Sequence, residues 1–199
     1  MKVRRADVLA IVFVVALVVA FVVAAPKRRS RNYGQSECVP NLRRLYVLYK
    51  IVTVDGPETL HSLGESYRGT NSSQIASEYF TLLSSALGGP WRRGHHLVCP
   101  LDRNVSPGPQ GGLASSNLSY FASIARPSGG SDWVLMGNRN LDWDPSKPGL
   151  PEASWNPANG LHGTNGFILT IDGSVRGFTG SGVTELVKGS NKGNHLVFP

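Results

Sequence analysis

The longest apolar run of the chain lies near its start. Residues Val8 to Ala25 carry no charged side chain and lie between Asp7 and Pro26. A helix of about 20 apolar residues crosses a bilayer core of roughly 30 Å, so this run is just long enough with some tilt. The pattern predicts a transmembrane anchor over residues 1–26 and a head domain over residues 27–199.

The same run permits other interpretations. The basic residues Lys2, Arg4 and Arg5, followed by the apolar run and Val22-Val23-Ala24 or Val23-Ala24-Ala25, are also typical of a secretory signal peptide. Cleavage after Ala24 is favoured over cleavage after Ala25, because the latter would put Pro26 first. A core helix of a soluble domain is another alternative. Basic residues flank the run on both sides and are slightly more numerous after it, so the positive-inside rule alone favours a cytoplasmic head. We favour an exported head because of the cysteines described below.

Two further segments have the spacing of amphipathic helices. From Ser36 to Val52, apolar residues recur every three or four positions, which predicts a helix with one buried face, collinear with the anchor. A second helix is predicted from Ser73 to Leu87, before Gly88-Gly89-Pro90. Residues Thr184 to Lys188 predict a short third helix.

The remaining apolar runs are short and predict strands. They are Leu97–Pro100, Leu118–Ala125, Trp133–Met136 and Leu196–Phe198. Phe167–Ile171 and Ser174–Phe178 flank Asp172-Gly173, and because Asp-Gly supplies the positive φ of a type I′ turn, they predict a β-hairpin. The segment Asn138–Pro157 has no clear period and is predicted to be a long loop, a kind of segment that is often functional.

Composition and charge narrow the class of protein. Residues 27–199 are enough for one modest domain, and the 23 glycines and 13 prolines favour short strands and turns. The net charge is +7, and seven basic residues lie at or before Arg31, around the apolar run. We therefore assign this charge to lipid headgroups and predict a membrane partner and no nucleic-acid partner.

Cys38 and Cys99 are the two cysteines of the chain. An even pair behind an export-type N-terminus predicts one disulfide, which in the chain-entropy model stabilises the domain by roughly 4 kcal/mol. Two alternatives stay open. The cysteines could be buried thiols, in which case a cytoplasmic head gains support, or Cys99 could bind a metal with His95 and His96, although no second cluster has zinc spacing.

One polar stretch has the spacing of a calcium loop. Asn138, Asn140, Asp142 and Asp144 place oxygen ligands at every second position, although Trp143 stands where an EF-type loop has glycine. The sequence predicts no cofactor other than this candidate calcium ion.

The sequence does not predict an enzyme. Gly-x-Ser-x-Gly, His-Glu-x-x-His and paired-carboxylate motifs are absent from it. His162 and Asp172 could be proposed as a catalytic pair. A histidine that holds a loop against the following hairpin is the favoured interpretation.

Five stretches together resemble a known family. His162, nine intervening residues and Asp172-Gly173 resemble the C-terminal signature of the H-x9-DG prepilin-type family of bacterial type IV pilin-like proteins. Further stretches are similar to that family in the same order: Cys38–Leu45, His96–Asp102, Asn117–Phe121 and Gly137–Asn140. The resemblance covers most of the chain from Asp7 onward.

The resemblance implies an α+β, pilin-like fold: a long N-terminal helix, with a transmembrane half and an amphipathic half, packed on a small antiparallel sheet. It implies a membrane-anchored pseudopilin or minor pilin of a type II secretion or type IV pilus system, whose partners are other pilin-like subunits and the secretion or pilus machinery. The predicted location is the bacterial inner membrane, with a single pass and the head in the periplasm or at the cell surface.

Asp7 is the residue that the resemblance assigns to assembly. It aligns with the acidic residue of the family helix, which is proposed to pair with the amino terminus of a neighbouring subunit. The alternative is that Asp7 complements the helix dipole and Arg4. The family's cleavage-site glycine is absent before Asp7. A different class of function, a monomeric membrane-tethered or secreted periplasmic binding domain, would use the loop Asn138–Pro157 as its contact surface.

Overall fold

The structure, a computed structural model, describes most of the predicted head domain. The described residues are 14, 38–54, 60, 62, 71–85, 95–102, 104–106, 113–124, 130–143, 153–159, 161–190 and 196–199. Apart from Val14, the anchor predicted over residues 1–26, together with Asp7, lies outside them.

The two amphipathic helices are confirmed in place. Residues 38–54 are helical and bury Leu42, Leu45 and Tyr49, which are 0%, 0% and 4% exposed. The second helix, α3, spans Ser72–Ser85. It begins after Asn71, whose side-chain oxygen accepts a hydrogen bond from the backbone N–H of Ser73 at 3.1 Å, as N-cap residues do.

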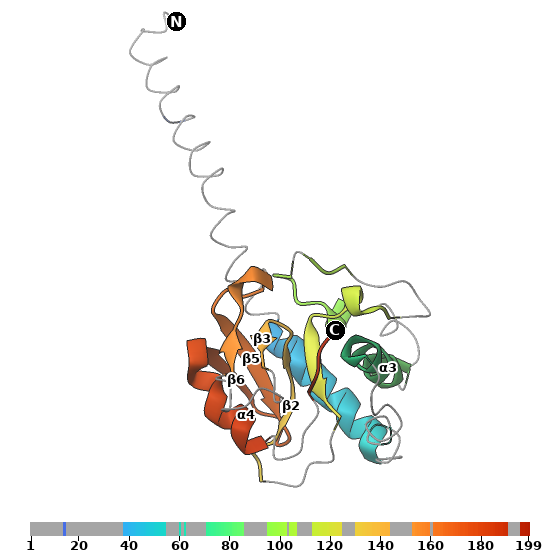
Figure 1. The fold of residues 1–199 in the computed structure, drawn as a ribbon. Coiled ribbons are helices and arrows are strands. Elements are labelled where there is room, and N and C mark those ends of the chain that lie inside the picture. The colour runs from blue at the N-terminus through green and yellow to red at the C-terminus, as the bar shows by residue number, and fades with distance from the viewer. Residues whose placement is uncertain are drawn as a thin grey trace, which may run out of the picture.

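Five strands form an antiparallel sheet in the order β6-β5-β2-β1-β7 (Figure 1). They are β1 (Tyr120–Ser123), β2 (Val134–Asn138), β5 (Asn165–Thr170), β6 (Val175–Thr179) and β7 (Leu196–Val197). The predicted strands around residues 118–125, 133–136 and 196–198 and the predicted hairpin therefore all join one sheet. Strands β1 and β2 are buried along their whole length because helices cover both faces.

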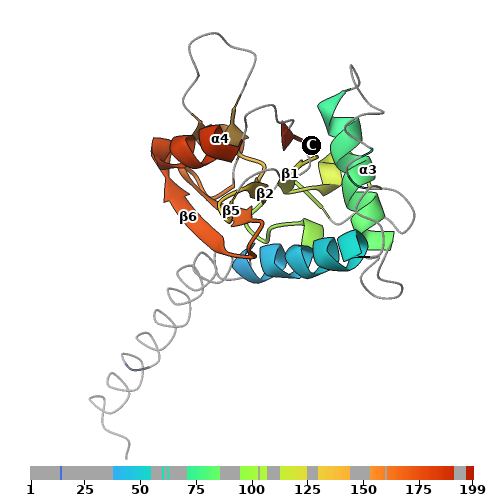
Figure 2. The ribbon, with the colours of Figure 1, turned by 90° about the horizontal axis from the view of Figure 1, so that it is seen from below.

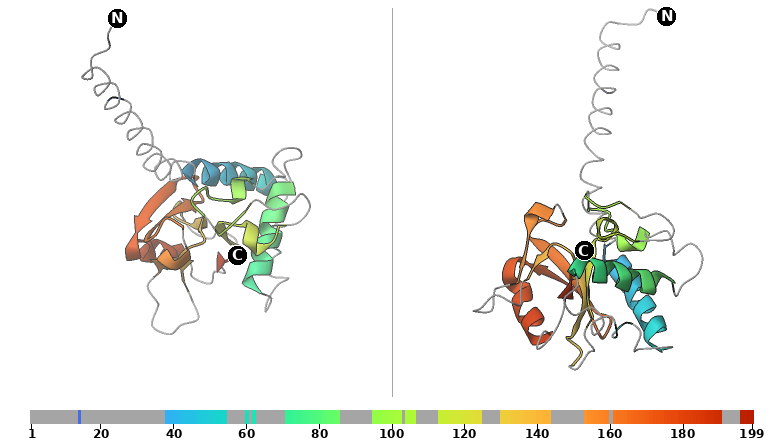
Figure 3. Two further views of the ribbon diagram at one scale, coloured as in Figure 1. Left: turned by 90° about the horizontal axis from the view of Figure 1, so that it is seen from above. Right: turned by 45° about the vertical axis from the view of Figure 1, so that its right-hand side comes forward.

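The sheet separates two apolar clusters. Alternate residues of a strand point to opposite faces, so Leu169 of β5 packs with the 38–54 helix and α3, whereas Ile168 packs with α4 (Thr184–Ser190). Figure 2 shows the 38–54 helix (blue to cyan) and α3 on one side of the strands and α4 on the other. Figure 3 shows the same elements from above and in an oblique view turned by 45° from Figure 1. The short helix predicted at residues 184–188 is thus confirmed, and it completes a third layer.

The predicted long N-terminal helix is wrong for the part of the chain that the structure describes. The helices there are short: residues 38–54, α3 and α4. No helix among the described residues is long and apolar enough to cross a membrane, and this finding corrects the prediction of a single-pass inner-membrane protein. Of the predicted long helix, the structure describes the amphipathic half, and this 38–54 helix is not a membrane span because its outer face exposes Arg43, Arg44 and Lys50, charges that hydrocarbon does not solvate.

Two local predictions are also wrong. Residues 97–100 were expected to be a strand end, but Leu97 is the last residue of the short 3₁₀ helix η2 (His95–Leu97). The chain then turns, and the N–H of Asp102 donates to the carbonyl of Cys99 at 2.8 Å. Within the expected loop 138–157, β3 (Leu141–Asp142) pairs with β4 (Ser154–Trp155). Two-residue strands are too short to show a period in the sequence.

The hairpin is confirmed, but its turn differs from the predicted type I′. Gly173 has φ +84°, whereas Asp172 does not have positive φ. The N–H of Gly173 donates to the carbonyl of Thr170 at 2.9 Å, and the N–H of Thr170 donates to that of Ser174 at 3.0 Å. This is a three-residue connection with glycine in the left-handed conformation, which is another common hairpin turn.

Candidate functional site

The cysteines form the predicted disulfide. Cys38, in the 38–54 helix, is bonded to Cys99, which follows η2, with Cα atoms 5.5 Å apart. Both side chains are fully buried. The Cα separation is typical of disulfides, and the bond holds the 38–54 helix to a segment 61 residues further along the chain.

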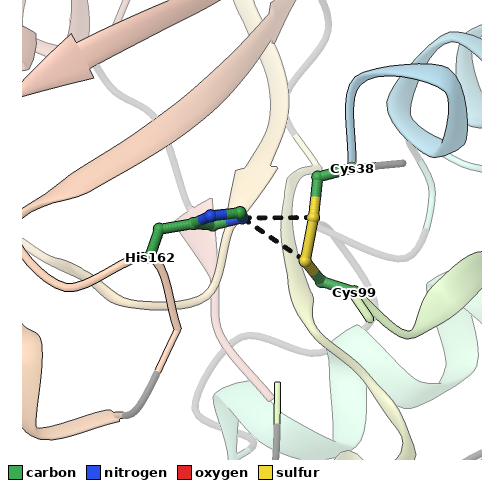
Figure 4. A group of neighbouring side chains, drawn as sticks. All are labelled: Cys38, Cys99 and His162. Atoms are coloured by element: carbon green, nitrogen blue, oxygen red, sulfur yellow. Dashed lines mark hydrogen bonds between the residues drawn. A yellow bond between two sulfur atoms is a disulfide. The ribbon is translucent and has the colours of Figure 1, made fainter. Parts of the chain in front are cut away.

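His162 lies directly against this disulfide. Its Nε2 is 3.1 Å from Cys38 Sγ and 3.3 Å from Cys99 Sγ, so the ring points at both sulfur atoms (Figure 4). The residue is 9% exposed, and burial lowers the pKa of its imidazole, an effect that the Asp102 carboxylate partly opposes. His162 is also the one non-glycine residue in the described part of the chain with positive φ, at +34°.

Asn140 holds the loop that carries His162. Its side-chain Nδ2 lies 3.4, 3.3 and 3.1 Å from the carbonyl oxygens of Leu161, Gly163 and Asn165, and its two N–H groups are shared among these three acceptors. Asn140 is fully buried, so these contacts are shielded from water. The amide therefore fixes the backbone on both sides of His162 and sets the direction of its ring.

A buried ion pair fixes the segment that carries Cys99. Arg139 Nε and Nη2 donate to the two carboxylate oxygens of Asp102 at 2.7 and 2.8 Å. Ser119 Oγ donates to the same carboxylate at 2.8 Å, and so does the backbone N–H of Asn104 at 3.2 Å. The Asp102 side chain is fully buried and that of Arg139 is 19% exposed. This pair joins the residues after the disulfide to the turn after β2.

The Asp172-Gly173 turn contacts the same helix as the disulfide. The hydroxyl of Tyr46, in the 38–54 helix, donates to the carbonyl of Ile171 at 3.1 Å. A Cβ placed on Gly173 would lie 2.6 Å from the Tyr46 ring, so glycine is needed there for space as well as for its φ of +84°. His162 and Gly173 therefore fasten the two ends of β5 to one helix.

The other predicted sites are not assembled as expected. Cys99 is grouped with Cys38 and His162 and not with His95 or His96. His162 and Asp172 lie beyond opposite ends of β5, a six-residue strand that is roughly 20 Å long, so they do not form a catalytic pair.

Of the candidate calcium ligands, two are used by the fold. Asn138 Oδ1 accepts the N–H of Phe167 at 2.7 Å, and Asn140 Nδ2 holds the His162 loop. Asp142 is exposed on β3, and Asp144 lies outside the described residues. Calcium binding stays a prediction.

Several residues of the site were not predicted in the roles that they have. Asp102 and Arg139 were not singled out by spacing or composition, and Asn140 was singled out only as a candidate calcium ligand. All three occur in stretches that resemble the H-x9-DG family, and this resemblance is the signal that points to them. Tyr46 has no such signal, because nothing local shows that its hydroxyl meets a turn 125 residues away.

Comparisons of the chain with protein-family models, curated proteins and solved structures find no match.

The hairpin carboxylate has a lowered pKa. Asp172 Oδ1 accepts hydrogen bonds from the hydroxyl of Thr170 at 2.6 Å and from the N–H of Ser174 at 2.9 Å. These bonds, that of Thr170 above all, lower the pKa of Asp172 from 3.8 to about 2. Because the folded state favours the ionised carboxylate, its contribution to stability is complete above the ordinary pKa and is lost as the pH falls through about 2.

We expect Asp172→Asn to remove this pH dependence. Asparagine keeps the accepting oxygen but cannot ionise. The native protein should be more stable than the variant at pH values above 3.8, and the difference in melting temperature should shrink as the pH approaches 2. Thermal unfolding of both proteins between neutral pH and pH 2 measures it, and a difference that is constant across this range contradicts the assignment. Because Asp172 is exposed, solvent screening keeps the effect small.

Proposed function

We propose that this protein is an assembly subunit of the pseudopilin or minor-pilin type, which acts through contacts with other pilin-like subunits of a type II secretion or type IV pilus system. The observation that carries the proposal is a row of exposed apolar side chains on the 38–54 helix. Val47, Ile51 and Val54 are 57%, 39% and 79% exposed. We call these three residues the apolar row.

The apolar row has the spacing of a helix-packing surface. Residues four and three positions apart lie on one helix face, and the opposite face of this helix, with Leu45 and Tyr49, is already buried against the sheet. Among the described residues, the other large hydrophobic side chain that is exposed is Val14. Grouped exposed apolar residues are typical of protein–protein contacts, whereas single ones need no explanation.

The proposed partner is a helix of another subunit. A second copy would meet the apolar row with its own row, as in a two-fold contact in which the same surface is used twice. Arg43 and Lys50 border the row and are exposed, so acidic groups on a related subunit would complement them. The resemblance to the H-x9-DG family, in which function is assembly, supports this assignment over catalysis.

Self-association of the full chain tests the proposal. We expect the native protein to form oligomers in sedimentation and crosslinking experiments, and the variant Val47→Asp/Ile51→Asp to weaken association at least tenfold. A tenfold increase in the dissociation constant corresponds to a loss of about 1.4 kcal/mol of binding free energy. Burial of one large apolar side chain contributes about 1.5–3 kcal/mol, so losing the row is enough for this change. Because both positions are exposed, the variant should unfold at nearly the native temperature.

A matched control variant distinguishes the loss of the apolar row from the effect of added negative charge. Gln74→Asp/Thr81→Asp also places two carboxylates on exposed positions of a helix, here α3, and should leave association unchanged. A native chain that stays monomeric over the whole concentration range contradicts the proposal and favours the monomeric binding domain. Equal loss of association in both variants contradicts the assignment to the apolar row.

A further inference from the structure

The residues around the disulfide are of the types that bind zinc. In the described part of the chain, Cys38, Cys99 and His162 are the one group of three or more His, Cys, Asp or Glu side chains whose ligand atoms lie together, all within 4.8 Å of one another. Thiolate sulfur and imidazole nitrogen are the preferred zinc ligands in proteins. The three residues come from three separate parts of the chain, and Figure 4 shows their side chains converging.

The imidazole is poorly satisfied next to a disulfide. Its Nε2 faces two sulfur atoms, which are weak acceptors, and its Nδ1 is buried with no hydrogen-bond partner among the described residues. A buried polar atom without a good partner destabilises the folded state. A buried imidazole at this position therefore destabilises the fold, whereas an apolar side chain packed in the same place would not.

The direction of the ring is nevertheless strongly determined. The φ of +34° at His162 is unfavourable for a residue with a side chain, and such conformations persist where the surroundings impose them. Asn140 bonds the carbonyls on both sides of His162, and the edge of the ring meets Phe167 with centroids 5.2 Å apart. Fixed orientation of a ligand by neighbouring groups is a regular property of metal sites.

We propose that, when its disulfide is reduced, the Cys38–Cys99–His162 cluster binds one zinc-class divalent ion. The site would exchange a disulfide crosslink for a metal crosslink between the same two segments. The proposal does not depend on the assembly function, because the apolar row lies on the exposed face of the 38–54 helix and the cluster is buried.

The imidazole nitrogen needs to move little to accept the ion, whereas the two sulfur atoms must separate. Ligands at about 2.3 Å for sulfur and about 2.05 Å for nitrogen around a tetrahedral ion are roughly 3.6 Å apart for each sulfur–nitrogen pair. Nε2 already lies 3.1 and 3.3 Å from the two sulfur atoms, so it would withdraw by a few tenths of an ångström. The sulfur atoms, released from each other, would separate to roughly 3.8 Å. Three protein ligands leave the fourth position for a water molecule.

The chemistry requires a reductant of the dithiol or phosphine class. A dithiol transfers two electrons and two protons to the sulfur–sulfur bond, which breaks to give the thiols of Cys38 and Cys99, while the dithiol is oxidised to a disulfide. The ion then binds both thiolates and the lone pair of His162 Nε2, and two protons are released. A small-molecule disulfide reverses the exchange: the two thiolates re-form the Cys38–Cys99 bond, the small disulfide takes up the two electrons, and two protons from water, to give two thiols, and the ion is released.

Metal titration of the full chain tests the proposal. The protein is reduced with a phosphine, freed of excess reductant without oxygen, and titrated with Co²⁺ and then Zn²⁺. We expect one Co²⁺ per chain, with the absorption of thiolate-to-cobalt charge transfer and of tetrahedral cobalt, and its displacement by one equivalent of Zn²⁺. The oxidised protein should show neither. Zn²⁺ should also raise the melting temperature of the reduced protein and leave that of the oxidised protein unchanged.

Two histidine variants test whether His162 is a ligand of the ion: His162→Asn removes it, and His95→Asn is the control. His162→Asn should bind at least tenfold more weakly, and asparagine suits the site because it tolerates positive φ. His95→Asn, at an exposed position outside the cluster, should bind as the native chain does. Absence of the cobalt spectrum in the reduced native chain overturns the proposal, and so does equal affinity in His162→Asn. If the reduced chain is unfolded by circular dichroism and Zn²⁺ does not restore its fold, the proposal also fails.

Discussion

Replacing Arg139 with alanine is expected to lower the free energy of unfolding by about 3–5 kcal/mol. The change leaves the carboxylate of Asp102 fully buried with two donors, Ser119 Oγ and the N–H of Asn104, in place of four. Removing one partner of a buried ion pair is costly because the remaining charge has lost both water and its counter-charge. Denaturant unfolding of the native and variant proteins measures the loss.

The matched control is Arg176→Ala. Arg176 also pairs with an aspartate, Asp132, at 2.6 Å, but these side chains are 43% and 64% exposed. Exposed pairs contribute about 0–1 kcal/mol, so the control should lose little. Equal losses in the two variants would show that the Asp102–Arg139 pair does not stabilise the segment that carries Cys99.

Reducing the disulfide, with a chelator present to exclude metal, is expected to lower the free energy of unfolding by roughly 4 kcal/mol. The bond joins two residues with a sequence separation of 61. In the chain-entropy model, a crosslink of this span lowers the conformational entropy of the unfolded chain and so destabilises the unfolded state by roughly 4 kcal/mol. The loss is a large part of the 5–15 kcal/mol that stabilises a typical domain. Denaturant unfolding with and without reductant gives the value, and thiol alkylation followed by mass measurement verifies the reduction.

The double variant Cys38→Ala/Cys99→Ala is the control for this experiment. It should be less stable than the oxidised native protein, and reductant should not change its midpoint. A native midpoint that stays constant while both thiols become alkylated would show that the crosslink contributes nothing to stability. Added Zn²⁺ should recover part of the loss in the reduced native chain if the proposed metal site forms.

His162 and Gly173, at the two ends of the H-x9-DG pattern, both contact the 38–54 helix. His162 meets the disulfide of the 38–54 helix, and Gly173 meets Tyr46 of the same helix. The spacing between them is the length of β5 with its two connections. On this view the motif attaches the β5–β6 hairpin, at one edge of the sheet, to the helix whose outer face carries the apolar row, so the attachment supports the surface that we propose for assembly.

Local signals were sufficient for part of the fold. The three- and four-residue spacing of apolar positions located the 38–54 helix and α3, because burial of one helix face leaves that spacing in the sequence. Asp172-Gly173 located the hairpin, although the detailed turn differs, since one glycine with positive φ suits more than one turn type. The apolar run before Pro26 led to an expected long helix and membrane span, which the described helices do not contain.

The sequence by itself determined the amphipathic helices, the hairpin and the presence of one disulfide, because periodicity, turn residues and a cysteine pair are local or countable features. The tertiary structure alone decided that His162 lies on that disulfide, across separations of 124 and 63 residues, and that Asn140 orients it. It also decided the pairing of β3 with β4. These contacts depend on how distant segments pack and on a backbone conformation at His162 that its side chain disfavours, and neither leaves a periodic trace in the chain.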